Sequence, residues 1–298
     1  MKNFDFIAKK KIFYIITLVL LVAGLVSFFV RGFNIDIDFA GGTEASLDIG
    51  KEVTVAERDA IRDIVLENLD DKSKYSSVEK SAADANMVII KTNQLTADEK
   101  AKIFDALIAR YGLDVKDFDS YESQSATLGK ETTATAIKTS VIAVILMLVY
   151  ITFRFQFTSG LASVLCLVFN LYVMFTLYSL FQIPLNSNVI AACLTILGYS
   201  INATIIIFDR VRENLKSDKN FAKVANDGVH QTFWRSVNTT ITTLLTIGMI
   251  YIFGVEAIRN FALPLIVGIV AGLFSSVCLA SPIWGDLRKL FKVDAKKD

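Results

Sequence analysis

One apolar stretch of the sequence carries a regular series of polar side chains. From residue 235 onward they recur at intervals of three and four, which places them on one face of a helix. Because polar groups that face lipid are costly, we expect this face to meet other helices or a water-filled cavity. This polar face indicates one of two roles. It forms a path for an ion or proton that is entered beside Arg235, or it forms hydrogen bonds between helices. The residues are Arg235, Asn238, Thr239, Thr242, Thr243 and Thr246.

A second apolar stretch carries a matching polar face, and the stretch before it has one asparagine midway. Asp209 is followed by Arg210, so a salt bridge at the level of the lipid headgroups is the alternative to a role in ion movement. The apolar cores contain no Asp, Glu or His. A typical proton-driven transporter needs a titratable relay at that depth, and this chain alone provides none. The residues of interest are Thr195, Tyr199, Asn202, Asp209 and, in the earlier stretch, Asn170.

Residue types that serve enzymes or metal sites are scarce. His230 is the only histidine, so neither a Ser-His-Asp triad nor a multi-histidine metal site is expected, and we interpret it as a solvated loop residue. The cysteines are Cys166, Cys193 and Cys278, all in apolar runs and none in a C-x-x-C spacing. We therefore predict a protein that is not an enzyme and holds no metal or cofactor.

Six apolar stretches are long enough to cross a bilayer, in a chain of 298 residues that is 53% hydrophobic. The first is too long for a signal-peptide core and has no A-x-A site after it, so we expect a retained anchor. Gly268, Gly272 and Ser276 recur every four residues in the last stretch, which favours close helix packing. The predicted spans are 12–30, 135–153, 161–180, 189–208, 237–253 and 261–280.

Charge is strongly segregated although the formal net charge is only +1. Residues 31–133 contain 13 basic and 21 acidic residues, and the remainder contains 18 basic and 9 acidic residues. Basic flanks of apolar spans are typical of a membrane protein rather than a nucleic-acid binder, and they predict that both termini are cytoplasmic. We divide the chain into an anchor at 1–30, an extracytoplasmic domain at 31–133, a helical bundle at 134–283 and a basic tail at 284–298.

The segment 31–133 has the pattern of a ferredoxin-like βαββαβ domain. Residues 35–48 alternate like strands around a turn at Gly41 and Gly42, between Asp38 and Thr43. No lysine or helix follows this pair at the spacing that phosphate binding requires, so we interpret it as a turn. Capping boxes at 54–57 and 96–99 open two helices, Gly112 ends the second, and the remaining strands are expected at 75–80, 87–92 and 114–121.

The chain resembles the SecF family, the smaller partners of SecD in bacterial protein export, over nearly its whole length. The most specific match is GYSINATIIIFDRVREN at 198–214, close to the family's G-Y-S-x-N-D-T-x-V-x-F-D-R-x-R-E-N. DFAGGT at 38–43, RSVNTTITT at 235–243 and FSSVCLASP at 274–282 resemble three further family motifs, and residues 125–131 match a fourth loosely. The resemblance implies six helices related to RND-type transporters and a moving outer domain that engages the emerging polypeptide.

Two residues depart from the family pattern. The aspartate of the family's N-D-T is Ala203 here, and a His-Asp pair often seen in the third helix aligns with Phe169 and Asn170. Both changes remove acids, whereas the matching arginine, Arg235, remains. The acid that drives the cycle is then expected in a SecD partner, or the coupling ion is sodium held by Asn, Thr and backbone oxygens, or coupling is lost.

The hypothesis that follows is a non-enzymatic export subunit of the bacterial cytoplasmic membrane. The implied partners are SecD, the SecYEG channel, the translocating preprotein and the bilayer, without nucleic acid. Two alternatives stay open: an RND-like half-transporter for small apolar molecules, and an ion-independent scaffold of the translocase. Candidates for the ion path are Arg235, Asn202, Thr204, Asn170, Asn238, Thr239, Thr242 and Asp209.

Overall fold

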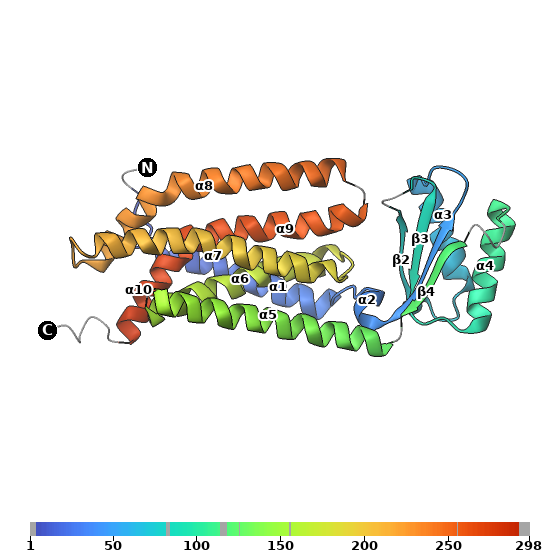
Figure 1. Ribbon diagram of the computed structural model, residues 1–298, viewed down its shortest axis with the longest axis horizontal. Helices are drawn as coiled ribbons and strands as arrows, with labels where there is room; N and C mark the ends of the chain where they lie inside the picture. The colour runs from blue at the N-terminus through green and yellow to red at the C-terminus, as the bar shows by residue number, and fades with distance from the viewer. Residues whose placement is uncertain are drawn as a thin grey trace.

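The computed structural model describes residues 4–81, 84–113, 118–124, 126–154, 156–254 and 256–291. The molecule is elongated, with a bundle of long helices at one end and an α/β domain at the other (Figure 1). The first long helix begins, and the last one ends, at the end of the bundle farthest from the α/β domain. We call this the terminal end of the bundle, and the opposite one its domain end.

Six helices of the described chain are long and apolar enough to cross a membrane, as the sequence predicts. The sixth is a rod of three segments, with a π-helical turn between two α-helices. It continues to Leu290, beyond the predicted end of the bundle at 283, and residues 292–298 lie outside the described residues. The helices are α1 (Lys10–Arg31), α5 (Ala126–Arg154), α6 (Phe157–Phe181), α7 (Asn188–Asn214), α8 (Phe221–Phe253) and the rod of α9 (Glu256–Phe274), η3 (Ser275–Leu279) and α10 (Ala280–Leu290).

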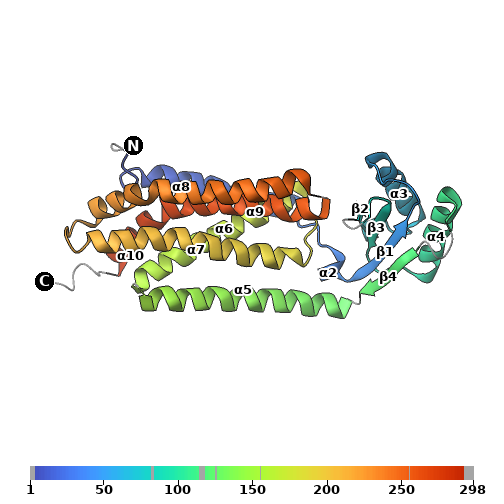
Figure 2. The same ribbon diagram turned by 45° about the horizontal axis from the view of Figure 1, so that its top comes forward.

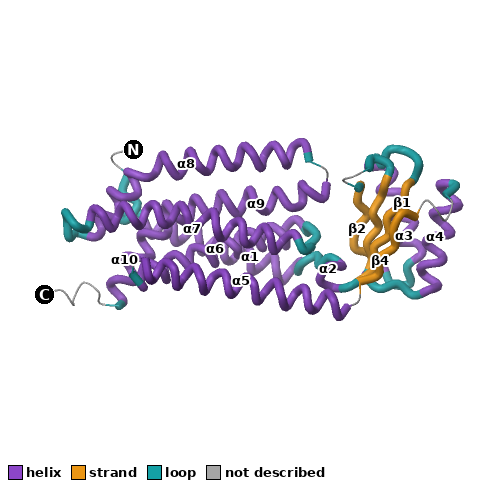
Figure 3. The backbone as a smooth tube through the Cα atoms, viewed as in Figure 1, coloured by secondary structure: helices purple, strands orange, loops and turns teal. Residues whose placement is uncertain are grey.

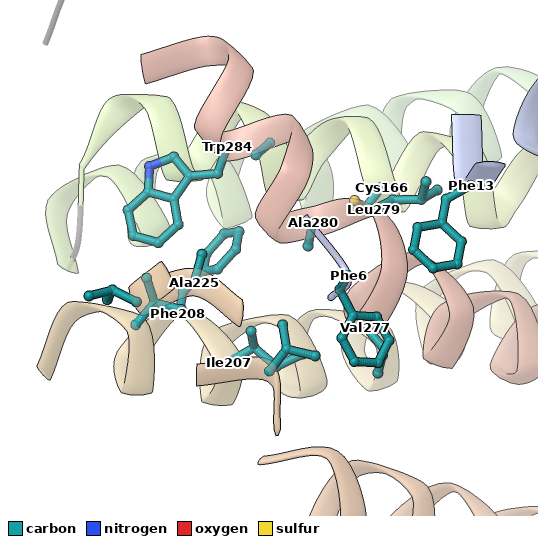
Figure 4. Close-up of a cluster of buried hydrophobic side chains, with 14 of the residues drawn as sticks. Phe6, Phe13, Cys166, Ile207, Phe208, Ala225, Val277, Leu279, Ala280 and Trp284 are labelled. Atoms are coloured by element: carbon teal, nitrogen blue, oxygen red, sulfur yellow. The ribbon is translucent and has the colours of Figure 1, made fainter. Parts of the chain in front are cut away.

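The α6 helix lies at the centre of the bundle, where it contacts α1, α5, α7, α9 and α10. α5 runs along one side of the bundle in both ribbon views (Figure 2). Near the terminal end, aromatic side chains fill the space between the helices (Figure 4). There the Trp284 indole packs on Phe208 with ring centroids 4.7 Å apart and donates a hydrogen bond to Thr158 Oγ1 at 3.2 Å. This buried cluster ties the rod to α6 and α7.

The α/β domain confirms the βαββαβ order. Its strands form one antiparallel sheet in the order β2-β3-β1-β4. α3 and α4 cover the face of the sheet that points away from the bundle (Figure 3), and Leu47, Val88 and Ile90 pack under them. The complete capping box of Thr96 and Glu99 opens α4, and Gly112 ends it in the left-handed conformation. The elements are β1 (Gly42–Asp48), α3 (Val55–Asn68), β2 (Tyr75–Lys80), β3 (Met87–Thr92), α4 (Ala97–Tyr111) and β4 (Phe118–Gln124).

The prediction of strands on both sides of the Gly41–Gly42 turn was wrong for the first half. Ile35 forms one isolated bridge with Leu185, and the chain then makes a helical turn, α2 (Ile37–Ala40). Asp36 explains this, because its Oδ1 accepts a hydrogen bond from the Ile37 amide at 2.7 Å and so begins a helix.

Both glycines of this turn are required by the backbone. Gly41 has φ +76°, a conformation that suits glycine. A Cβ on Gly42 would overlap the carbonyl of Thr92 in β3. At the other end of the domain, β4 begins at Phe118, and residues 114–117 of the expected last strand, like Ser125, lie outside the described residues.

Candidate functional site

The polar residues of α8 lie on the surface of the bundle. Arg235, Asn238, Thr239 and Thr242 are exposed, and α8 turns them away from the helices of this chain. The threonine hydroxyls donate to carbonyl oxygens one turn earlier, with Thr239 Oγ1 2.8 Å from the Arg235 oxygen and Thr242 Oγ1 2.8 Å from that of Thr239. Their donors are therefore satisfied within the helix, while their oxygens remain able to accept.

The polar residues of α7 include an exposed set beside those of α8. Thr195 and Asn202 are exposed, and a Cβ placed on Gly198 between them would meet no atom within 4 Å. The Tyr199 hydroxyl donates to Thr240 Oγ1 at 3.2 Å and joins the two helices. We call these exposed residues the α7–α8 polar surface: Thr195, Gly198, Asn202, Arg235, Asn238, Thr239 and Thr242.

Two of the predicted path residues are buried inside the bundle. Thr204 is buried on the opposite side of α7, where its Oγ1 is 2.9 Å from Ser276 Oγ in the π-helical segment. Asn170 is fully buried in α6, and neither atom of its amide has a hydrogen-bond partner among the described residues. The structure therefore brings Asn202, Asn238 and Thr239 to one surface and leaves Thr204 and Asn170 inside the bundle.

The small residues of the rod lie against α7. A Cβ on Gly268 would overlap Ile196, and one on Gly272 would overlap Ser200. Close approach of these helices leaves room for the hydrogen bond that Ser276 Oγ donates to the Ser200 carbonyl at 3.3 Å. The contact fixes the position of α7, and with it the position of Asn202 on the opposite side of that helix.

Charged residues gather at the terminal end. Asp209 is half-buried near the end of α7, and Arg210 pairs with Glu213 at 2.7 Å. The prediction that His230 is solvated was wrong: its Nε2 lies 2.6 Å from the Phe4 carbonyl oxygen, and its ring meets Phe6 edge-on. The reason is that the chain before α1 folds back onto α8.

The turn after α1 joins the bundle to the α/β domain. Asp38 Oδ2 accepts hydrogen bonds from the Ser187 amide, at 2.8 Å, and from its hydroxyl, immediately before α7 begins. Asp36 Oδ2 accepts one from Lys91 Nζ in β3 at 3.2 Å, inside a buried region. The residue that precedes α7 and the sheet are thus held by carboxylates two positions apart.

Sequence reasoning found Asp38 but missed Asp36 and Lys91. The available signal was Lys91, the one charged residue of the strand Met87–Thr92. Burial lowers the pKa of Lys91, but the nearby carboxylates of Asp36, Glu79 and Glu44 outweigh it and raise that pKa. The lysine therefore stays charged and holds the junction together. Within the described chain, no three His, Cys, Asp or Glu side chains gather as they would around a metal ion.

Comparison with known proteins gives a consistent picture. The family described as "Protein export membrane protein SecD/SecF, C-terminal" matches residues 106–290. The chain is 33% identical over 297 residues to the protein translocase subunit SecF of Acidaminococcus fermentans, covering 98% of this chain and 100% of that one. It is 36% identical to the SecF subunit of Sebaldella termitidis, covering 97% and 93%.

Longer relatives match over part of their length. The protein translocase subunit SecDF of Bacillus subtilis is 32% identical, over 95% of this chain and 38% of that one. The crystal structure of SecDF from Thermus thermophilus, described as a translocon-associated membrane protein, superposes with a TM-score of 0.76 at 29% identity. The match covers 97% of this chain and 39% of that chain. This chain is similar to one portion of these proteins.

Proposed function

The chain belongs to the SecF family of protein translocase subunits, and we propose that it couples an ion gradient to movement of its α/β domain during protein export. It is a multi-pass membrane protein that works with SecD, and it is not an enzyme. In the proposed orientation both termini lie in the cytoplasm. The α/β domain then faces the exported polypeptide and the SecYEG channel on the other side of the membrane.

The α7–α8 polar surface is the observation that supports this proposal best. Arg235 and Asn202 lie on helices long and apolar enough to span a membrane, yet both are exposed among the residues that the structure describes. Polar and charged groups in that position are expensive unless protein or water meets them. The SecDF relatives carry additional chain beyond the part similar to this one. A SecD bundle is therefore the proposed cover for this surface.

Arg235 also supports a proposal in which SecD supplies the acid that this chain lacks. A guanidinium at the membrane level needs a counter-charge, and the position beside Asn202 that could supply one is Ala203. We place the missing acid on the SecD side of the interface. Asn202, Asn238 and Thr239 then line the path and Arg235 tunes it, with the coupling ion, proton or sodium, decided by the partner.

The test is a pulse-chase of a secreted precursor in cells depleted of this protein. Wild-type chain should restore export, and Arg235→Met should restore at most about a tenth of it while still assembling with SecD. Lys219→Met, in the exposed connection before α8, removes a charge outside the polar surface and should behave as wild type. An ionophore for protons or for sodium should cancel the rescue and so identify the ion.

Other outcomes separate the alternatives. Full export with Arg235→Met would remove the coupling role. Rescue that no ionophore affects would instead favour a scaffold. Unchanged export on depletion, together with substrate-dependent efflux, would identify a half-transporter of small apolar molecules. Ala203→Asp adds the family's acid, and a changed ionophore sensitivity in this variant would locate the path beside Asn202.

A further inference from the structure

A polar cavity of about 260 Å³ lies where the α/β domain meets the domain end of the bundle. One wall is the β2 strand, and the other walls are the connection before α2, the α6–α7 connection and the first turns of α9. The cavity is large enough for a cation together with several waters, because one water occupies about 30 Å³ in the liquid. Its polar residues are Asn34, Tyr75, Ser77, Glu79, Gln182 and Asn260.

The β2 wall presents two buried polar side chains without a hydrogen bond. Ser77 is 9% exposed and its hydroxyl has no partner among the described residues. Glu79 is 8% exposed, and its carboxylate accepts no hydrogen bond from the part of the chain that the structure describes. Unlike Ser77 Oγ, the carboxylate oxygens of Glu79 reach the open volume of the cavity, where a bound cation can meet them.

The nearest lysine is already engaged. Lys91 Nζ lies 3.2 Å from Asp36 and 3.8 Å from Glu44, while Glu79 has no ion pair within the described residues. The carboxylates of Asp36, Glu79 and Glu44 all act on the charge of Lys91. Glu79 lies in the cavity wall and shares this lysine without a direct ion pair to it.

The bundle side supplies neutral oxygens. Asn34 and Gln182 use their amide NH2 groups to donate to backbone carbonyls, at 3.1 Å to Gln182 and 2.7 Å to Ser179, so their amide oxygens are left to accept. Asn260 makes no hydrogen bond to the described residues. One carboxylate with amide and hydroxyl oxygens is the ligand set that hard cations prefer.

We propose that this cavity binds a hard cation, sodium or calcium, through the Glu79 carboxylate and the surrounding neutral oxygens. The ligands come from both bodies of the molecule, Ser77 and Glu79 from the sheet and Asn34, Gln182 and Asn260 from the bundle. A bound cation therefore fastens the α/β domain to the bundle. This site is separate from the α7–α8 polar surface and does not depend on ion-coupled export.

Thermal unfolding of the full-length chain in detergent tests the site. Ionic strength is held constant with choline chloride, and sodium, calcium or magnesium replaces it in separate titrations. We expect a saturable rise in Tm of about 2–4 °C with sodium or calcium. Glu79→Gln should abolish the rise. Glu52→Gln is the matched control, since Glu52 is an exposed acid of the same domain that pairs with Lys80.

Terbium luminescence gives a second readout that does not need an unfolding transition. Terbium is a hard cation excited through nearby tyrosine, and Tyr75 lies in the cavity wall. Emission should appear with wild type, fall on addition of sodium or calcium, and be lost in Tyr75→Phe and Glu79→Gln. If no cation shifts the Tm of wild type, or if Glu79→Gln responds as wild type does in both assays, the site does not exist.

Discussion

At the residue scale, Glu99 shows how one carboxylate can connect two separate segments of a domain. Its side chain is fully buried, and Lys74 Nζ contacts both carboxylate oxygens at 2.8 Å. The amides of Thr96 and Asp70 donate to it as well, at 2.9 and 3.2 Å. The hydrogen bonds from Lys74 and Thr96 lower the pKa of Glu99 from 4.5 to about 2. The same residue thus caps α4 and anchors the chain before β2.

Glu99→Gln should destabilise the α/β domain by about 2 kcal/mol, since the buried carboxylate loses its charged hydrogen bonds with the partly exposed Lys74. Hydrogen exchange of the α4 amides in the full-length protein measures this loss, with the exposed Glu67→Gln as the control. In wild type the folded pKa is depressed, so the contribution is complete above about pH 4.5 and declines as the pH falls toward 2. Equal pH dependence in wild type and Glu99→Gln would contradict this assignment.

At the element scale, the contact between the rod and α7 depends on the absence of side chains. Gly268 and Gly272 let the two helices approach until Ile196 and Ser200 fill the space a Cβ would take. One turn further, the helix widens into the π-helical segment Ser275–Leu279, where Ser276 meets Thr204. Close packing and polar contacts between helices are the main sources of stability inside a membrane.

Gly272→Leu should therefore lower the Tm of the full-length chain in detergent by several degrees, because overpacking costs about 1–3 kcal/mol. Gly248→Leu is the matched control, since a Cβ at Gly248 in α8 would meet no atom within 4 Å. A loss of stability confined to Gly272→Leu is the expected result. Similar Tm values for the two variants would mean that the helices are not in close contact at this position.

At the scale of the whole molecule, the exposed surface of the bundle is of two kinds. α1 and α5 expose apolar residues, such as Leu18 and Val141, that suit lipid. α7 and α8 expose Asn202, Arg235 and a glycine with open space in front of it. Only the apolar surface can face the lipid hydrocarbon at a low free-energy cost. The polar surface of α7 and α8 therefore predicts where another protein docks.

Gly198→Trp should leave the chain folded yet reduce its co-purification with SecD at least about tenfold, a change worth about 1.4 kcal/mol. A Cβ at Gly198 would meet no described atom within 4 Å, so we expect the added ring to extend outward and fill the proposed interface. Val141→Trp, on the lipid-facing side of α5, should assemble as wild type does. Equal recovery of SecD with both variants would place the interface elsewhere.

Much of the fold follows from short-range physics that the sequence displays directly. Apolar runs of bilayer length set the six membrane helices, because backbone polar groups in lipid must be satisfied within the helix. Short strand-like runs indicate β2 and β3, and the capping residues Thr96 and Gly112 set the limits of α4. The motif at 198–214 indicated the SecF family from the sequence alone. A SecF relative that matches over nearly the whole chain confirms that family.

The remainder was decided by contacts between residues far apart in the chain. Alternation alone made 35–40 look like a strand, but Asp36 caps a helical turn there and reaches Lys91. Helical spacing aligned polar residues on α7 and α8, yet the side of α7 that faces out is decided by tertiary contacts such as the packing of Gly272 on Ser200. In the sequence Glu79 looks like an ordinary strand residue, and its place in the cavity wall depends on how the α/β domain meets the bundle. Periodicity specifies the faces of an element; the neighbours of each face are fixed by tertiary packing.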